Sequence, residues 1–171
     1  MTTPDVAHFR HDPSRVADER SMYQSWLDFH RGTLLWKCAG LTDDQLKAAA
    51  VSPSSLTLLG LVRHMAEVER SWFRTRAAGL PLEYLYCSDD DEDGDFDNIA
   101  DADVEQDIAT FKAECLAADE AASTLSLDHT FEGRNGSISL RWVYVHMIEE
   151  YARHNGHADL LRESIDGATG D

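Results

Sequence analysis

The stretch Leu140–Gly167, LRWVYVHMIEEYARHNGHADLLRESIDG, is the part of the sequence that decides the fold. Four of its side chains, His146, Glu150, His154 and His157, are spaced by four, four and three residues. At about 100° per residue, a helix places all four within roughly 80° of one another. Imidazole and carboxylate groups are costly to bury without partners. The spacing therefore predicts an amphipathic helix with metal-ligand side chains on one face, and a divalent metal ion is the simplest explanation for that face.

Three more amphipathic helices precede this one. Apolar residues recur at spacings of three and four, which is typical of helices with one buried face. The predicted helices run from about Arg15 to Cys38, from Ser55 or Thr57 to about Gly79, from about Asp101 to Thr124, and from about Ser139 to Ile165. Such a set, with no convincing strand, favours an all-α four-helix bundle. The connection between the second and third helices is about twenty residues long, which predicts a long crossover connection or a functional loop.

Length and composition predict one ordered domain. The chain has 171 residues, of which 43% are hydrophobic, and we expect residues 1–171 to form a single domain with an irregular lead-in at 1–14. No apolar run reaches the length of about 18 residues that a membrane span needs. The first residues lack the pattern of a secretory signal, so a cytoplasmic protein is expected.

The four tryptophans and two of the three cysteines are predicted to be packing residues. Trp26, Trp36, Trp72 and Trp142 fall on apolar stripes and are predicted to lie in the core. Cys38 and Cys115 occupy apolar helical positions and are expected to be buried, whereas Cys87 falls in a loop without neighbours that would lower its pKa. No CxxC motif is present, which disfavours a disulfide framework or a cysteine-rich zinc site.

The net charge of −17 disfavours binding to nucleic acids and to anionic membranes, because such a surface repels phosphate groups. Much of this charge lies between Asp89 and Asp107, where eleven acids and no Lys or Arg occur. Within an acidic loop predicted at 86–100, the run Asp89–Asp97 resembles a calcium-binding EF-hand loop, but Ala100 stands where that motif needs Glu. A solvated acidic loop, acting as a lid or a partner-facing surface, is the better interpretation.

His64 in the second predicted helix, within GLVRHMAEVERSW, is the candidate partner for the late helix. It follows Leu61 and precedes Met65, so it is expected at the edge of the apolar stripe. With Glu150 and His154 it gives two imidazoles and one carboxylate, a set that suits zinc and also iron(II) or nickel(II). A lone core histidine is more often a hydrogen-bonded structural residue, and this alternative stays open.

These residues resemble the DinB-like superfamily of metal-binding four-helix bundles. Its usual late motif is His-x-x-x-His-x-Gly-Gln, and the matching positions here are Glu150, His154, Gly156 and His157. The similarity covers most of the chain and is closest to the mini-circle protein branch. Glu150 departs from the usual histidine but is similar to the His, Glu, His set of mycothiol-dependent maleylpyruvate isomerase. His157 in place of glutamine leaves its role open.

The resemblance implies a thiol-dependent transferase or isomerase with a divalent metal held by His64, Glu150 and His154. A low-molecular-weight thiol such as mycothiol is the expected cosubstrate, and a small electrophile is the expected second substrate. His157 or His146 is a candidate for proton transfer, and either is alternatively a partner that orients a ligand.

Two arginines of the last predicted helix complete the predicted site. Arg153 or Arg162 is a candidate for holding a carboxylate of the thiol or the electrophile. Inter-helix salt bridges are the alternative role for both. A second class of function also stays open, a non-enzymatic metal- or ligand-binding bundle with a structural or vestigial site, and a homodimer is possible in either case.

Overall fold

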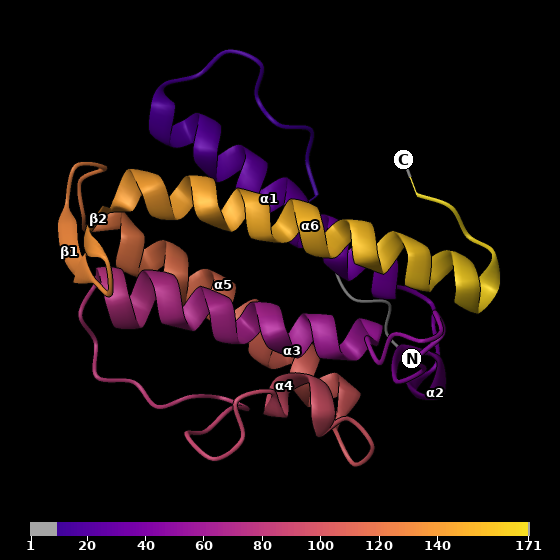
Figure 1. Cartoon of the computed structure of the whole chain (residues 1–171). Coiled ribbons are helices and arrows are strands. Elements are labelled where there is room, and N and C mark those ends of the chain that lie inside the picture. The colour runs from indigo at the N-terminus through magenta and orange to yellow at the C-terminus, as the bar shows by residue number, and fades with distance from the viewer. Residues whose placement is uncertain (1–9, 171) are drawn as a thin grey trace.

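The computed structural model describes residues 10–170, and it is mostly helical (Figure 1). The long helical segments are α1 (Glu19–Cys38), α3 (Leu58–Glu69) with its π-helical continuation η2 (Arg70–Ala77), α5 (Val104–Ser123) and α6 (Leu140–Asp166). Two one-turn helices and one hairpin lie between them, α2 (Asp43–Leu46), α4 (Gly94–Asp97), β1 (Thr130–Gly133) and β2 (Gly136–Ser139). The predicted helices therefore exist, and the hairpin adds a small antiparallel sheet to the predicted all-helical chain.

The long helices lie side by side, with α6 between α1 and α3 and with α5 behind (Figure 1). The connection at 78–103, which contains α4, returns along the molecule, so α3 and α5 run in the same direction and pack on one another. This return brings the predicted acidic loop against α3. None of the helices within residues 10–170 combines the length and the apolar character that a membrane crossing needs.

Local signals explain where the helices begin and end. The side chains of Asp18, Thr57, Asp103 and Ser139 each accept a backbone N–H from the first turn of the helix that follows. Gly167 ends α6 with φ of 78°, a left-handed conformation that favours glycine. Because Asp18 caps α1, this helix starts at Glu19 and not at the predicted Arg15. Residues 10–14 of the predicted lead-in are irregular, and residues 1–9 lie outside the described part of the chain.

The core is a continuous cluster of apolar side chains between the long helices. It contains fully buried residues from α1, α3, α5 and α6, among them Leu34, Met65, Phe111 and Met147. Cys38 and Cys115 are buried as predicted.

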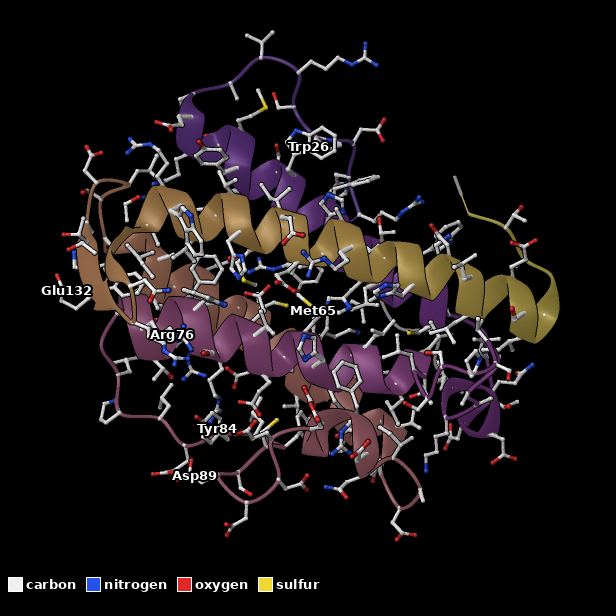
Figure 2. All side chains as sticks on the ribbon, viewed as in Figure 1. Trp26, Met65, Arg76, Tyr84, Asp89 and Glu132 are labelled. Atoms are coloured by element: carbon white, nitrogen blue, oxygen red, sulfur yellow. The ribbon has the colours of Figure 1, made fainter. Side chains whose placement is uncertain are left out.

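None of the four tryptophans predicted to lie in the core is buried there, since Trp36 and Trp72 are half-buried and the other two are exposed. Trp26 is 42% exposed and Trp142 is 46% exposed (Trp26 is labelled in Figure 2). The prediction was wrong because each ring lies on the outer side of its stripe, where buried smaller residues such as Leu27 and Val143 take the core positions. An amphipathic pattern gives the direction of the apolar face but not its edge.

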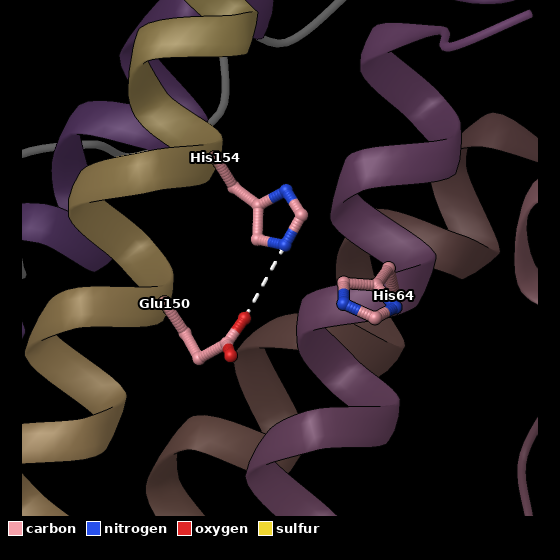
Figure 3. Close-up of side chains that lie close together, drawn as sticks. All are labelled: His64, Glu150 and His154. Atoms are coloured by element: carbon pink, nitrogen blue, oxygen red, sulfur yellow. Dashed lines mark ion pairs between the residues drawn. The ribbon is translucent and has the colours of Figure 1, made fainter.

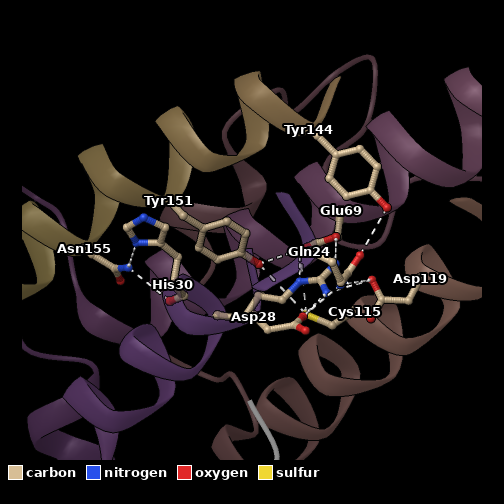
Figure 4. A network of polar contacts seen from close by, with 10 residues as sticks. Gln24, Asp28, His30, Glu69, Cys115, Asp119, Tyr144, Tyr151 and Asn155 are labelled. Atoms are coloured by element: carbon tan, nitrogen blue, oxygen red, sulfur yellow. Dashed lines mark hydrogen bonds and ion pairs between the residues drawn. The ribbon is translucent and has the colours of Figure 1, made fainter. Parts of the chain in front are cut away.

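A buried polar network crosses the core (Figure 4). Arg31 of α1 donates from Nε and Nη2 to the two carboxylate oxygens of Glu69 of α3, at 2.7 and 2.8 Å. The Tyr151 hydroxyl of α6 donates to Glu69 at 2.8 Å, and Arg31 Nη1 donates to Asp119 of α5 at 2.8 Å. Arg31, Glu69 and Tyr151 are fully buried. Every charge in the network is paired. Because the paired groups come from four helices, the network fixes the relative positions of these helices.

Candidate metal centre

His64 on α3 faces Glu150 and His154 on α6 (Figure 3). One ligand atom from each of the three side chains lies within 4.8 Å of the other two. The imidazole centroids of His64 and His154 are 4.8 Å apart, and His154 Nε2 lies 3.4 Å from a Glu150 oxygen. The side chains are 23%, 17% and 12% exposed for His64, Glu150 and His154, so the group is sheltered but open to a small ligand. The structure therefore brings the three predicted donors together.

A fourth side chain fixes the ring of His64. Nδ1 of His64 lies 2.8 Å from an oxygen of Asp95, which is 3% exposed and belongs to α4. Phe96 stacks on the same imidazole, with centroids 4.7 Å apart and planes at 28°. Because Asp95 engages Nδ1, the free nitrogen of His64 is Nε2. A carboxylate on the second nitrogen of a histidine is the usual partner of a metal-ligating imidazole, since it fixes the tautomer and the ring orientation.

His154 is neutral at pH 7. Burial is the main cause that lowers its pKa to about 4, and the nearby imidazoles of His64 and His157 lower it further. The 3.4 Å contact between His154 and Glu150 is therefore not a pair of opposite charges. A neutral imidazole is the form that coordinates a metal.

The donor set fits a divalent ion. Two imidazoles and one carboxylate form a ligand set known from catalytic zinc sites, which keep a further position open. The three donors come from two helices and lie within 4.8 Å, so small side-chain rotations bring them to the bond lengths of about 2 Å that zinc requires. The Asp95 contact adds the outer partner that such sites commonly have.

Three side chains of α3 hold the returning connection in place, namely those of Arg63, His64 and Glu67. Glu67 Oε2 accepts the backbone N–H groups of Leu85 and Tyr86, both at 2.8 Å. Arg63 donates to the carbonyl of Gly94 at 3.1 Å, next to the contact that Asp95 makes with His64. At Gly94 a side chain would meet a backbone oxygen at 2.4 Å, so only glycine allows this approach.

His146 and His157 lie on the two sides of the donor set along α6. His157 Nδ1 is 3.4 Å from His154 Nδ1, and His146 Nε2 is 3.7 Å from an oxygen of Glu150. Burial lowers the pKa of His146. His146, Glu149 and Glu150 also form a second close group of candidate donors, but Glu149 is exposed and pairs with Arg153. Both roles that the sequence left open for each histidine, proton transfer and ligand orientation, are compatible with these contacts.

The comparison with protein families bears on the same helices. A model of the mycothiol-S-transferase family matches residues 22–167, which include every donor described above. The chain belongs to the mycothiol-S-transferase family. This confirms the resemblance to the DinB-like superfamily, whereas the mini-circle branch stays a prediction. No curated protein and no solved structure matches the chain.

In this member of the mycothiol-S-transferase family, the two arginines proposed to hold a carboxylate make other contacts. Arg153 pairs with Glu149 one turn away on the exposed side of α6. Arg162 donates to the backbone carbonyls of Lys37 and Ala39 at 2.9 and 2.8 Å, which ties α6 to the end of α1. These contacts match the structural alternative that the sequence left open, and a role in substrate binding stays a prediction.

Asp95 is the site residue that sequence reasoning missed. It belongs to the run interpreted as a solvated acidic loop, and for this residue the interpretation was wrong, because Asp95 is buried against His64. The signal that could have found it is Phe96, the only aromatic residue within the acidic run. An apolar ring among carboxylates marks a point where the loop packs on the protein.

Proposed function

We propose that this chain is a divalent-metal-dependent thiol S-transferase that activates a mycothiol-like thiol for attack on a small electrophile. The observation that carries the proposal is the group His64, Glu150 and His154, with its donors within 4.8 Å and with His64 oriented by Asp95. Membership of the mycothiol-S-transferase family supports the thiol and the transfer reaction. The packing of the four long helices supports a DinB-like four-helix bundle, formed by one domain, as the scaffold.

His64, Glu150 and His154 would hold the metal ion. Zinc suits two imidazoles and a carboxylate with an open position, and nickel(II) or iron(II) accepts the same donors. A divalent ion at this place supplies the charge that favours the thiolate form of a bound thiol at neutral pH.

The residues of the chain supply orientation and proton transfer. Asp95 keeps His64 in the tautomer with Nε2 free. One of the two histidines next to the donor set, His157 or His146, takes the proton of the thiol. The sulfur forms a bond to the electrophilic carbon, and the electron pair displaced there goes to the leaving group or to the acceptor atom. The same imidazole then returns the proton to that atom.

Two measurements on the purified full chain test this function. Elemental analysis is expected to find about one divalent ion per chain in the parent and almost none in His154→Ala, with helix content unchanged by circular dichroism. The exposed α6 variant Glu163→Gln is the matched control and is expected to retain the ion.

Conjugation of mycothiol to a generic electrophile is then followed with and without a chelator. A reaction that the chelator abolishes and added zinc restores supports the transferase. A bound ion without chelator-sensitive conjugation would instead favour the non-enzymatic metal-binding bundle. Full metal content in His154→Ala would refute the ligand assignment.

A further inference from the structure

Three aromatic rings form a cluster beside the donor set. The rings of Trp142 and His146 on α6 are stacked, with centroids 4.8 Å apart and planes at 15°. Trp72 of η2 completes the cluster, with its ring centroid 5.3 Å from Trp142 and 4.7 Å from His146. Trp142 is 46% exposed, so the cluster presents an indole to solvent, while Trp72 packs against the core from a half-buried position.

A free cation lies on this cluster. The guanidinium carbon of Arg76 lies 4.4 Å from the ring centroid of Trp72, and Figure 2 labels Arg76 on η2. Arg76 is exposed, and within residues 10–170 it forms no ion pair with a carboxylate. In a chain with a net charge of −17, an arginine that lies on the Trp72 indole without an acidic partner is a local site for an anion.

The cluster is continuous with the donor set. His146 Nε2 lies 3.7 Å from an oxygen of Glu150, while its ring stacks on Trp142. The π-helical turns of η2 carry both Trp72 and Arg76, and π-helical turns are frequent at functional sites. A molecule lying on the indoles would therefore reach the place where the thiol is activated.

We propose that Trp72, Trp142 and His146, together with Arg76, form the acceptor subsite, which binds an electrophile with a planar aromatic body and a carboxylate. The proposal rests on the proposed function and names its second substrate by class. The rings stack on the aromatic body, and Arg76 pairs with the carboxylate.

The charges and the area of the cluster argue against other occupants. A cationic ligand is disfavoured, since Arg76 already occupies the Trp72 ring and repels a second positive charge. A second copy of the chain needs about 800 Å² on each partner for a stable dimer, whereas the exposed ring of the cluster is a single indole that is less than half exposed.

The test uses the metal-free full chain without thiol, so its result does not depend on catalysis. Binding of 4-nitrobenzoate and of neutral 4-nitrobenzamide is titrated by tryptophan fluorescence and checked by calorimetry. Arg76→Gln is expected to weaken the carboxylate probe about tenfold and the amide by less than twofold. Trp142→Ala is expected to weaken both probes. Arg15→Gln removes the same charge from another exposed arginine and is expected to change neither.

Several outcomes would overturn the subsite. They are equal loss of 4-nitrobenzoate binding in Arg76→Gln and Arg15→Gln, equal affinity for the two probes, and displacement of the probe by glucosamine or inositol, which would assign the indoles to a sugar. A change from dimer to monomer in Trp142→Ala, measured by light scattering, would assign them to a second copy. A parent chain that binds neither probe but retains chelator-sensitive conjugation would overturn the subsite and leave the proposed function standing.

Discussion

Replacing Asp95 by alanine should weaken metal binding without removing any proposed ligand. The substitution deletes the oxygen that lies 2.8 Å from His64 Nδ1, and the imidazole then loses its fixed tautomer and orientation. Mutation of an outer partner of this kind typically weakens metal binding by 10- to 100-fold, which corresponds to about 1.4–2.7 kcal/mol. The dissociation constant for zinc is measured by competition with a chromophoric chelator. We expect Asp95→Ala to weaken binding within that range.

The control is Asp97→Ala, which removes the same charge from the same one-turn helix at an exposed position. Its affinity for zinc is expected to stay within about twofold of the parent, because water screens the charge of an exposed carboxylate. Asp95→Asn keeps an oxygen acceptor for Nδ1 and is expected to fall between the parent and the alanine variant. Equal affinities for Asp95→Ala and Asp97→Ala would refute the reasoning, because the effect would then be one of net charge.

Two further predictions concern the core and the thiols. Glu69→Ala leaves Arg31 buried without its main partner, and we expect it to lower the free energy of unfolding by about 3–5 kcal/mol in urea denaturation. The control Glu163→Ala, at an exposed position, is expected to lower it by no more than about 0.5 kcal/mol. A small effect of Glu69→Ala would show that the network is not stabilising. Burial raises the pKa of Cys87 to about 11, so its thiolate fraction at pH 7.5 is about 300-fold smaller than that of a thiol with a pKa of 8.5. Because the more basic thiolate is also the better nucleophile, alkylation by iodoacetamide at pH 7.5 should be about 20-fold slower than for that thiol and should accelerate as the pH rises toward 11. Fast alkylation at pH 7.5 would contradict the raised pKa.

The periodic parts of the site could be predicted from the sequence. Glu150 and His154 share one face because they are four residues apart on one helix, and this relation depends only on helix geometry. His64 could be assigned to the inner edge of its helix from the neighbouring apolar residues. That α3 and α6 bring these faces together was an expectation of the bundle, and the 4.8 Å grouping of the donors agrees with it.

The remaining parts depend on long-range packing that no local pattern contains. The contact between Asp95 and His64 joins residues 31 positions apart and arises because the connection returns along α3. The π-helical geometry of η2 was not predicted either, since its sequence continues the same apolar stripe as α3. Trp142 is exposed because it lies outside the part of α6 that neighbouring helices cover, and the sequence of α6 alone does not show how far that cover extends.

The acidic connection binds α3 mainly through its backbone, and this explains how so many carboxylates tolerate the position. Glu67 accepts backbone N–H groups of the connection, and Arg63 donates to the Gly94 carbonyl, so most acidic side chains stay in water. Only Asp95 turns inward, and it meets the imidazole of a proposed ligand. The docking of the connection and the orientation of His64 therefore share the same few contacts. Any change that loosens the connection from α3 also frees the ring of His64, so metal affinity and loop docking should change together.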